Sequence, residues 1–161
     1  MNIKNIFSIK NLYCLFLVLI IFILDRITKL KIIEKYSDHV EYINDFLNID
    51  LIWNTGIGFG ILSLNAGIFY NIISLIILIV IFLLIYLILT SNKLDSIFFS
   101  ILLGGATGNL YDRFTYFAVP DFIDLHFNDY HWFTFNVADI FITIGIILLI
   151  FKDIFFKNKN L

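Results

Sequence analysis

Four long apolar stretches, separated by polar segments, dominate the pattern of the chain. The clearest covers residues 68–90 and carries no charge, and the others cover about 7–28, 96–113 and 133–151. A helix needs roughly 20 residues to cross a hydrocarbon core of ~30 Å. The pattern therefore predicts four transmembrane helices in a single integral membrane domain, residues 1–161.

The first apolar stretch also has features of a cleavable signal peptide. Lys4 and Lys10 precede it, as in the basic region of such a peptide. No small-residue cleavage site follows Leu24, because the next residues are Asp25 and Arg26. We therefore expect the stretch to be kept as a membrane span.

An even number of spans places both ends of the chain on one side of the membrane. Lys and Arg are almost evenly divided, six on that side and five on the other. The loop 114–132 has none, whereas the tail after residue 151 has three. The positive-inside rule therefore favours cytoplasmic termini, with 29–66 and 114–132 on the extracytoplasmic side.

The segment at about 40–65 has a different pattern. Acidic residues recur in it, residues 46–52 alternate approximately between apolar and polar, and Asn54-Thr55-Gly56 is typical of a turn. The expected fold class is thus membrane all-α, with four transmembrane helices and a small extracytoplasmic β element between the first two. Trp53 and Trp132 suit the interfacial belt of the membrane.

Composition agrees with a membrane protein. Hydrophobic residues make up 60% of the chain and charged residues 15%, with a mean hydropathy of +0.93. Soluble domains are about 45–50% apolar and about 25% charged, so lipid is the expected solvent. The net charge of −2 provides no basic face, and we expect no nucleic-acid partner.

Charged residues near the predicted spans gather at one membrane face. Asp25 ends the first span, Asp112 and Arg113 end the third, and Asp139 lies six residues after Phe133 in the fourth. That spacing puts Asp139 about 9 Å below the interface. Because charge at membrane depth is costly and usually functional, these residues predict a polar site in one leaflet.

Helical spacing groups the polar residues further, because residues three or four apart share a face. The pairs are Asp25 with Lys29, Asn109 with Asp112 and Arg113, and Asn136 with Asp139. Asp121 and Asp124 add two carboxylates on the connection beside Pro120. The sequence therefore predicts an interfacial pocket with amides, two cations and several carboxylates.

The chemistry of such a pocket points to hydrolysis without a metal or cofactor. His39, His126, His131 and Cys14 lack the His-x-x-x-His and Cys-x-x-Cys spacings of metal ligands. Two carboxylates that share a low-dielectric site do not both ionise, so one holds a proton and the other acts as a base. This arrangement activates a water molecule.

Five ordered blocks resemble the lipoprotein signal peptidase (signal peptidase II) family. They are Asp25-Arg26-Ile27-Thr28-Lys29; Asn54-Thr55-Gly56 with Phe59-Gly60; Gly104 through Arg113, GGATGNLYDR; Val119-Pro120-Asp121-Phe122; and Phe135-Asn136-Val137-Ala138-Asp139. The resemblance implies an aspartyl endopeptidase of the bacterial cytoplasmic (inner) membrane, with its active site near the extracytoplasmic leaflet. Its substrate would be a prolipoprotein, cut just before a diacylglyceryl-cysteine within the lipid membrane.

The resemblance also implies roles for individual residues. Asp121 and Asp139 match the catalytic dyad. The positions that match residues binding substrate or supporting the dyad are Asp25, Lys29, Asn54, Gly56, Asn109, Arg113 and Asn136. Two departures from the family pattern are Ile57-Gly58, where two small residues are common, and Pro120, which restricts the backbone before Asp121.

Two other functions fit the residues alone. A small membrane subunit of an ion or proton pathway would also carry intramembrane acids, although it needs polar groups through both leaflets. A module that binds lipoproteins without cutting them would share the pocket. Cleavage of a lipidated peptide would distinguish a peptidase from both of these alternatives.

Individual residues also have plainer interpretations. Asp112, next to Arg113 at a helix end, is expected to have an ion-pair or interfacial role, and Asp124 is expected to be solvated. Asp139 taken as a purely structural acid would need Arg113 or Lys29 as its partner. Gly104, Gly105 and Gly108 are expected to allow close helix packing rather than to bind phosphate.

Overall fold

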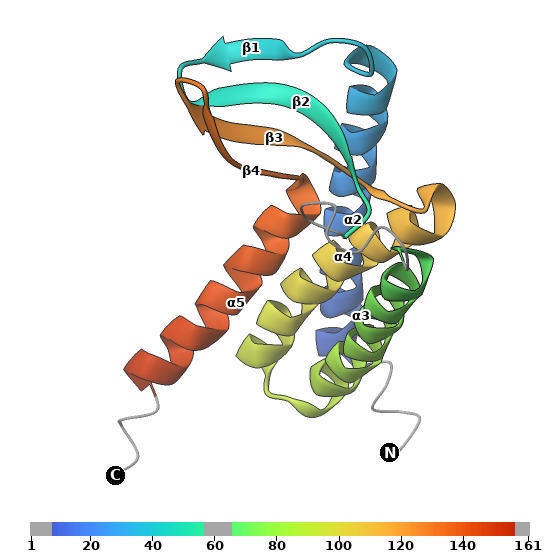
Figure 1. Ribbon diagram of the computed structural model, residues 1–161. Helices are drawn as coiled ribbons and strands as arrows, with labels where there is room; N and C mark the ends of the chain where they lie inside the picture. Colours follow the sequence, from blue (N-terminus) through green and yellow to red (C-terminus); the bar gives the residue numbers. More distant parts are fainter. Residues whose placement is uncertain (1–7, 57–65, 157–161) are drawn as a thin grey trace.

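The computed structural model describes residues 8–56 and 66–156, which form a helical bundle capped by an antiparallel sheet (Figure 1). The helices are α2 (Ile9–Lys35), α3 (Ala66–Thr90), α4 (Lys93–Tyr116) and α5 (Val137–Phe156). The strands are β1 (Glu41–Asn44), β2 (Leu47–Asn54), β3 (Val119–Phe127) and β4 (Tyr130–Phe135). The departure expected at Ile57-Gly58 lies outside the described residues.

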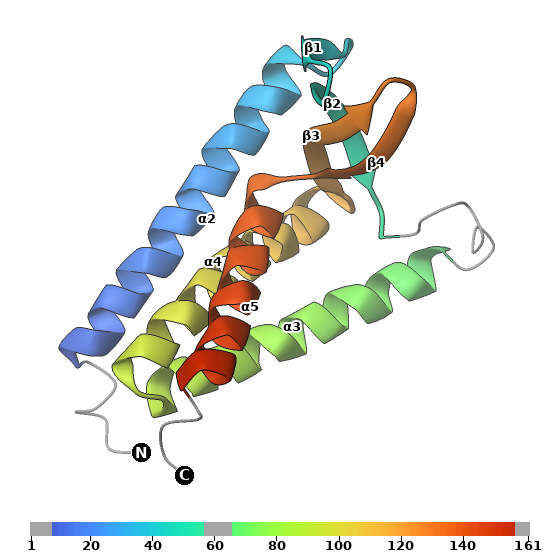
Figure 2. The same cartoon turned by 90° about the vertical axis from the view of Figure 1, so that its left-hand side faces the viewer.

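Helix α4 is the centre of the bundle and packs against each of the other three helices. In both views the sheet lies at one end of the bundle, and the start of α2 and the end of α5 lie at the other (Figures 1 and 2). The first and last described helices thus begin and end on the same side, as an even number of spans predicts.

Glycines on α4 allow its neighbours to approach closely. A Cβ at Gly104 would stand 2.7 Å from Cβ of Ile21 on α2, and one at Gly105 would stand 2.5 Å from the carbonyl oxygen of Ala138 on α5. Real side chains do not tolerate such contacts. The structure therefore confirms that these glycines serve helix packing.

The helices expose many large apolar side chains on their outer faces. On α3, for example, Phe82 is 63% exposed, and Leu75 and Ile79 are similarly open. Of the described helices, α2 and the Tyr70–Thr90 part of α3 are long and apolar enough to cross a membrane. That α4 and α5 also cross it stays a prediction.

The sheet is larger than the sequence predicted. Its order is β1-β2-β3-β4, with each neighbouring pair antiparallel. Only the segment at about 40–65 was expected to form β structure, and 114–132 was expected to be a connection. A lone two-stranded hairpin is marginally stable, and pairing of β2 with β3 joins two distant hairpins into one sheet.

The boundaries of three predicted spans need correction. The first helix continues to Lys35, seven residues beyond the expected end at 28. The last helix begins at Val137 rather than 133, because Phe133 and Phe135 pair with β3 as part of β4. Asp139 therefore lies in the first turn of α5 instead of six residues below its start. The third helix extends from Lys93 to Tyr116, beyond the expected 96–113 at both ends.

Candidate active site

Asp121 lies near the start of β3, at the end of the sheet that is nearest the helices, and two amide side chains hold it. Its side chain is buried, and its two carboxylate oxygens accept hydrogen bonds from Nδ2 of Asn54 at 2.8 Å and Nδ2 of Asn136 at 2.6 Å. Asn54 ends β2, and β2 pairs with β3 so that Ile52 faces Asp121. The pairing of the two hairpins thus brings Asn54 to this carboxylate.

The surroundings of Asp121 favour its protonated form. Burial, together with the negative charge of Asp139, raises the pKa of Asp121 from 3.8 to about 6, although the hydrogen bonds from Asn54 and Asn136 oppose the rise. Burial is the largest of these causes because it removes the water that would stabilise the carboxylate.

Asp139 is fixed by the start of α5. Its backbone N–H donates to Oδ1 of Asn136 at 3.1 Å, and its carboxylate accepts from the backbone N–H of Asn136 at 3.2 Å. This reciprocal pair is a capping arrangement, which satisfies N–H groups that have no partner within a helix. The predicted pairing of the two residues is correct, but it occurs across a helix start and not along a helix face.

Asn109 on α4 connects Asp139 to a buried cation. Its Nδ2 donates to Oδ1 of Asp139 at 2.7 Å, and its own Oδ1 accepts from Nζ of Lys29 at 2.9 Å. The ammonium group therefore sets the orientation of the amide, because only the amide oxygen can accept from it.

Lys29 is completely buried and lies between two carboxylates. Its Nζ is 2.8 Å from Asp25 and 2.6 Å from Asp112, and Asp112 also pairs with Arg26. Asp112 thus forms ion pairs, as expected, but with Lys29 and Arg26 and not with its neighbour Arg113. Consecutive helical residues point about 100° apart, and Asp112 faces the cations of α2.

Asp25 joins this ion-pair cluster to α5, the helix that carries Asp139. Its Oδ1 accepts from the backbone N–H of Ala138 at 2.9 Å, one residue before Asp139. The absence of a side chain at Gly108 makes room for Asp25, since a Cβ there would stand 2.5 Å from Oδ2. Asp25 and Lys29 therefore hold the start of α5 and do not meet Asp121 directly in any described hydrogen bond.

Arg113 points away from the cluster, toward α3 and the turn after β2. Its guanidinium lies 5.3 Å from the ring centre of Tyr70, and a Cβ at Gly56 would come within 3.3 Å of it. Gly56 has φ +79° and donates its N–H to Oδ1 of Asn54 at 2.7 Å. Among the described residues, no acceptor meets Nε and Nη1 of Arg113, and both atoms are buried.

Asp124 departs from the expectation that it is solvated. It is only 1% exposed, and its Oδ2 lies 2.7 Å from Nδ1 of His131 and 3.5 Å from Nδ2 of Asn48. These two partners lie on the neighbouring strands, because β3, which carries Asp124, pairs with both β2 and β4. Within the ranges that the structure describes, no group of three or more His, Cys, Asp or Glu side chains is arranged to hold a metal ion.

Sequence reasoning missed Arg26, Asn48 and His131 as partners of buried acids. Arg26 had a usable signal, because it lies three residues before Lys29 and so near the same helix face. Asn48 and His131 had none, because their partner Asp124 meets them only through strand pairing.

An apolar groove of about 350 Å³ leads to the site. Its walls come from α3, α4 and α5, and the lining residues include Ile77, Leu84, Ala106, Asn109, Ile142 and Ile146. Asn109 is the residue that also binds Asp139. The groove thus reaches the amide side chain that holds Asp139.

Comparison with known proteins places these features in a family context. The profile of the family described as Signal peptidase (SPase) II matches residues 17–155. The lipoprotein signal peptidase of Pelagibacter ubique (strain HTCC1062) is 48% identical over 160 residues, 97% of this chain and 96% of that protein. That of Anaplasma phagocytophilum (strain HZ) is 35% identical over 149 residues, 90% of this chain and 94% of that protein.

Two solved structures, each described as a bacterial membrane enzyme studied by the in meso method, are similar in fold. Both are 34% identical to this chain. One has a TM-score of 0.69 and covers 92% of both chains. The other has a TM-score of 0.70 and covers 86% of this chain and 90% of its own.

Proposed function

The chain belongs to the signal peptidase II family and is a membrane protease, and we propose that it uses Asp121 and Asp139 to cleave prolipoproteins. The cut would fall just before a cysteine that carries diacylglycerol. No cofactor or metal takes part in the proposed reaction.

The observation that carries the proposal is the double role of Asn136. Its side chain binds Asp121 and its backbone binds Asp139, so one residue holds a carboxylate of the sheet beside a carboxylate of α5. The charge of Asp139 is also among the causes that raise the pKa of Asp121. Such coupling is what a pair that shares one proton requires.

In the proposed mechanism the ionised carboxylate removes a proton from water, and the water oxygen attacks the scissile carbonyl carbon. The protonated carboxyl donates its proton to the carbonyl oxygen. When the C–N bond breaks, a proton passes from the dyad to the leaving amine. The pair titrates as a unit, so neither step is assigned to one residue alone.

Other groups would position the substrate. The N–H groups of Arg113 that meet no acceptor among the described residues would suit a backbone carbonyl of the substrate, and the absence of a side chain at Gly56 leaves room beside the guanidinium. The groove between α3, α4 and α5 suits the apolar parts of the substrate. Asn54 and Asn109 would hold the carboxylates during turnover.

The proposed topology has four spans in the bacterial cytoplasmic (inner) membrane, with cytoplasmic termini and an extracytoplasmic sheet. Helices α4 and α5, with 24 and 20 residues, have enough length for a hydrocarbon core of ~30 Å. The whole chain, residues 1–161, would then be one membrane domain, with the dyad near the extracytoplasmic leaflet.

A cleavage assay tests the proposal. The purified protein in lipid nanodiscs is given a diacylglyceryl-modified prolipoprotein peptide or the same peptide without diacylglycerol. We expect cleavage of the modified peptide only, and its loss in Asp121→Asn and Asp139→Asn. Asp129→Asn, an exposed acid at the turn between β3 and β4, is the matched control and should keep normal turnover.

Each contrary result is informative. Near-normal turnover in either dyad variant would exclude the proposed mechanism. Binding of the modified peptide by the wild-type protein without any cleavage would instead support a lipoprotein-binding module. Equal cleavage of both peptides would show that diacylglycerol is not recognised.

A further inference from the structure

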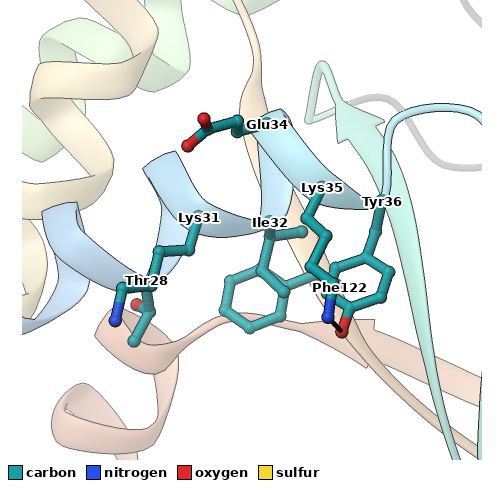
Figure 3. Close-up of a pocket in the computed structure, with 7 residues that line it drawn as sticks. All are labelled: Thr28, Lys31, Ile32, Glu34, Lys35, Tyr36 and Phe122. Carbon is teal, nitrogen blue, oxygen red and sulfur yellow. Dashed lines mark hydrogen bonds between the residues drawn. The ribbon is translucent and has the colours of Figure 1, made fainter.

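A second cavity lies on the side of the sheet away from Asp121. It has a volume of about 580 Å³ and opens between the last turns of α2 and strand β3. Figure 3 shows its lining, which includes Thr28, Lys31, Ile32, Lys35, Tyr36 and Phe122.

The cavity is separate from the candidate active site. Asp121 and Phe122 are consecutive in β3, and consecutive strand residues point to opposite faces of a sheet. Phe122 is 4% exposed and lines the cavity from below α2, whereas Asp121 binds Asn54 and Asn136 on the other face. A ligand in the cavity would therefore not compete with substrate at the dyad.

Two of the polar side chains that line the cavity are cationic, Lys31 and Lys35, and one, Glu34, is acidic. Within the part of the chain that the structure describes, Nζ of Lys31 has no hydrogen-bond partner, and Nζ of Lys35 donates to the hydroxyl of Tyr36 at 2.9 Å and also interacts electrostatically with Glu41. In Figure 3 Lys31 extends toward Thr28 and Lys35 toward the hydroxyl of Tyr36, one on each side of Ile32, and the carboxylate of Glu34 projects the other way. The two ammonium groups can thus bind an anion.

The position of the lysines along α2 indicates which anion is at hand. The helix has 27 residues, about 40 Å in length, and the hydrocarbon core is only ~30 Å thick. Leu24, Ile27 and Leu30 are exposed apolar residues on α2, and Lys31 follows Leu30 directly. The apolar surface therefore ends where the lysines begin, at the depth of lipid headgroups.

We propose that this cavity binds an anionic phospholipid of the surrounding leaflet. The headgroup phosphate lies between Lys31 and Lys35, and the glycerol backbone packs on Ile32 and Phe122. The acyl chains follow the exposed apolar residues of α2 toward the membrane centre. A bound lipid would join α2 to β3, the strand that carries Asp121, and this inference holds whether or not Asp121 is catalytic.

Native mass spectrometry tests the proposal. The purified protein in detergent is titrated with phosphatidylglycerol or with phosphatidylcholine of the same acyl chains, and the bound lipids are counted. We expect preferential binding of phosphatidylglycerol, weakened about thirtyfold in the double variant Lys31→Gln/Lys35→Gln, since each of the two cations near an anionic headgroup contributes about 1 kcal/mol. Both lysines are exposed, so the variant should fold.

The matched control is Lys93→Gln, which removes an exposed lysine at the start of α4, at the end of the bundle away from the sheet. It should leave binding of phosphatidylglycerol unchanged. A second variant, Ile32→Trp, fills the cavity without altering charge and should also weaken binding, with thermal unfolding as the check on folding.

Three results would overturn the proposal. One is equal binding by the wild-type protein and the double lysine variant, and another is an equal loss in Lys93→Gln, which would indicate attraction by charge alone. The third is displacement of phosphatidylglycerol by millimolar inorganic phosphate, which would identify a site for free anions instead of lipid.

Discussion

The side-chain amide of Asn136 donates a hydrogen bond of 2.6 Å to the carboxylate of Asp121. Asn136 is also the residue before α5, and its Oδ1 accepts the backbone N–H of Asp139. The position of its amide is therefore set by the helix, and the amide in turn sets the sheet carboxylate. Asp121 and Asp139 are held relative to each other by this single residue.

Replacement of Asn136 should damage both catalysis and helix α5. In Asn136→Ala the cap of α5 is lost, which costs about 1 kcal/mol, and Asp121 loses a donor. We expect kcat for the lipidated peptide to fall on the order of a hundredfold, measured beside the melting temperature.

The control for this variant is Asn92→Ala. Asn92 caps α4 in the same way, with Oδ1 accepting from the backbone N–H of Asp95 at 3.1 Å, but it lies far from the dyad. A similar loss of stability with unchanged kcat is expected. If Asn92→Ala lowers kcat equally, the effect of Asn136 reflects helix stability and not its contact with Asp121.

The carboxyl of Asp121 should titrate near neutral pH. Its pKa is raised to about 6, and Asp139→Asn should lower it because a nearby negative charge is removed. Infrared or ¹³C NMR titration of the labelled carboxyl in the two proteins measures this change. A pKa of about 4 in the wild-type protein would contradict the burial of this group.

The same pKa has a consequence for stability. Because the pKa is higher in the folded protein than the ordinary 3.8, protonated Asp121 stabilises the fold fully below about pH 4, and this contribution is lost as pH rises through about 6. The melting temperature of Asp121→Asn, relative to that of the wild-type protein, should therefore rise between about pH 4 and about pH 6. Above about pH 6 the difference between the two melting temperatures should stay constant. A constant difference across the range would exclude the shift.

Lys29 should be essential to the fold. In Lys29→Met, the carboxylates of Asp25 and Asp112 lose the cation that lies 2.8 Å and 2.6 Å from them. Breaking a buried ion pair from one side costs about 3–5 kcal/mol, although Arg26 still pairs with Asp112. Thermal unfolding in detergent measures the loss, and Lys93→Met, at an exposed position, should change stability by less than about 0.5 kcal/mol.

The contact between α4 and α5 should be sensitive to a single methyl group. Gly105→Ala places a Cβ against the carbonyl oxygen of Ala138, so α5 must shift, at a cost of about 1–3 kcal/mol. The shift moves Asp139 away from Asn109, and kcat should fall with stability. Gly67→Ala on α3 meets no atom within 4 Å and should leave both quantities unchanged or slightly improve stability; an equal loss there would rule out the packing explanation.

Several parts of this molecule follow from local patterns in the sequence. Apolar runs predicted the helices because a helix in lipid must present apolar side chains outward, and family membership was evident from the ordered blocks. The i,i+4 spacing of Asp25 and Lys29 also predicted their contact, since helical geometry alone brings them together.

Other parts depend on contacts between distant segments, which no local pattern contains. Residues 123–127 alternate between apolar and polar and are followed by Asn128-Asp129, so a local strand signal was present and our prediction overlooked it. That β3 pairs with β2 had no such signal. That pairing buries Asp124 and brings Asn54 to Asp121. The partners of Asp112 likewise depend on which face of α4 meets α2.

The sequence by itself thus determined the apolar helices, the family and the residue types of the site, because these depend on composition and short-range spacing. Only the tertiary structure decided which acids meet which partners. Strand pairing and helix contacts join residues far apart in the chain, and they place Asp121 of the sheet and Asp139 of α5 around Asn136.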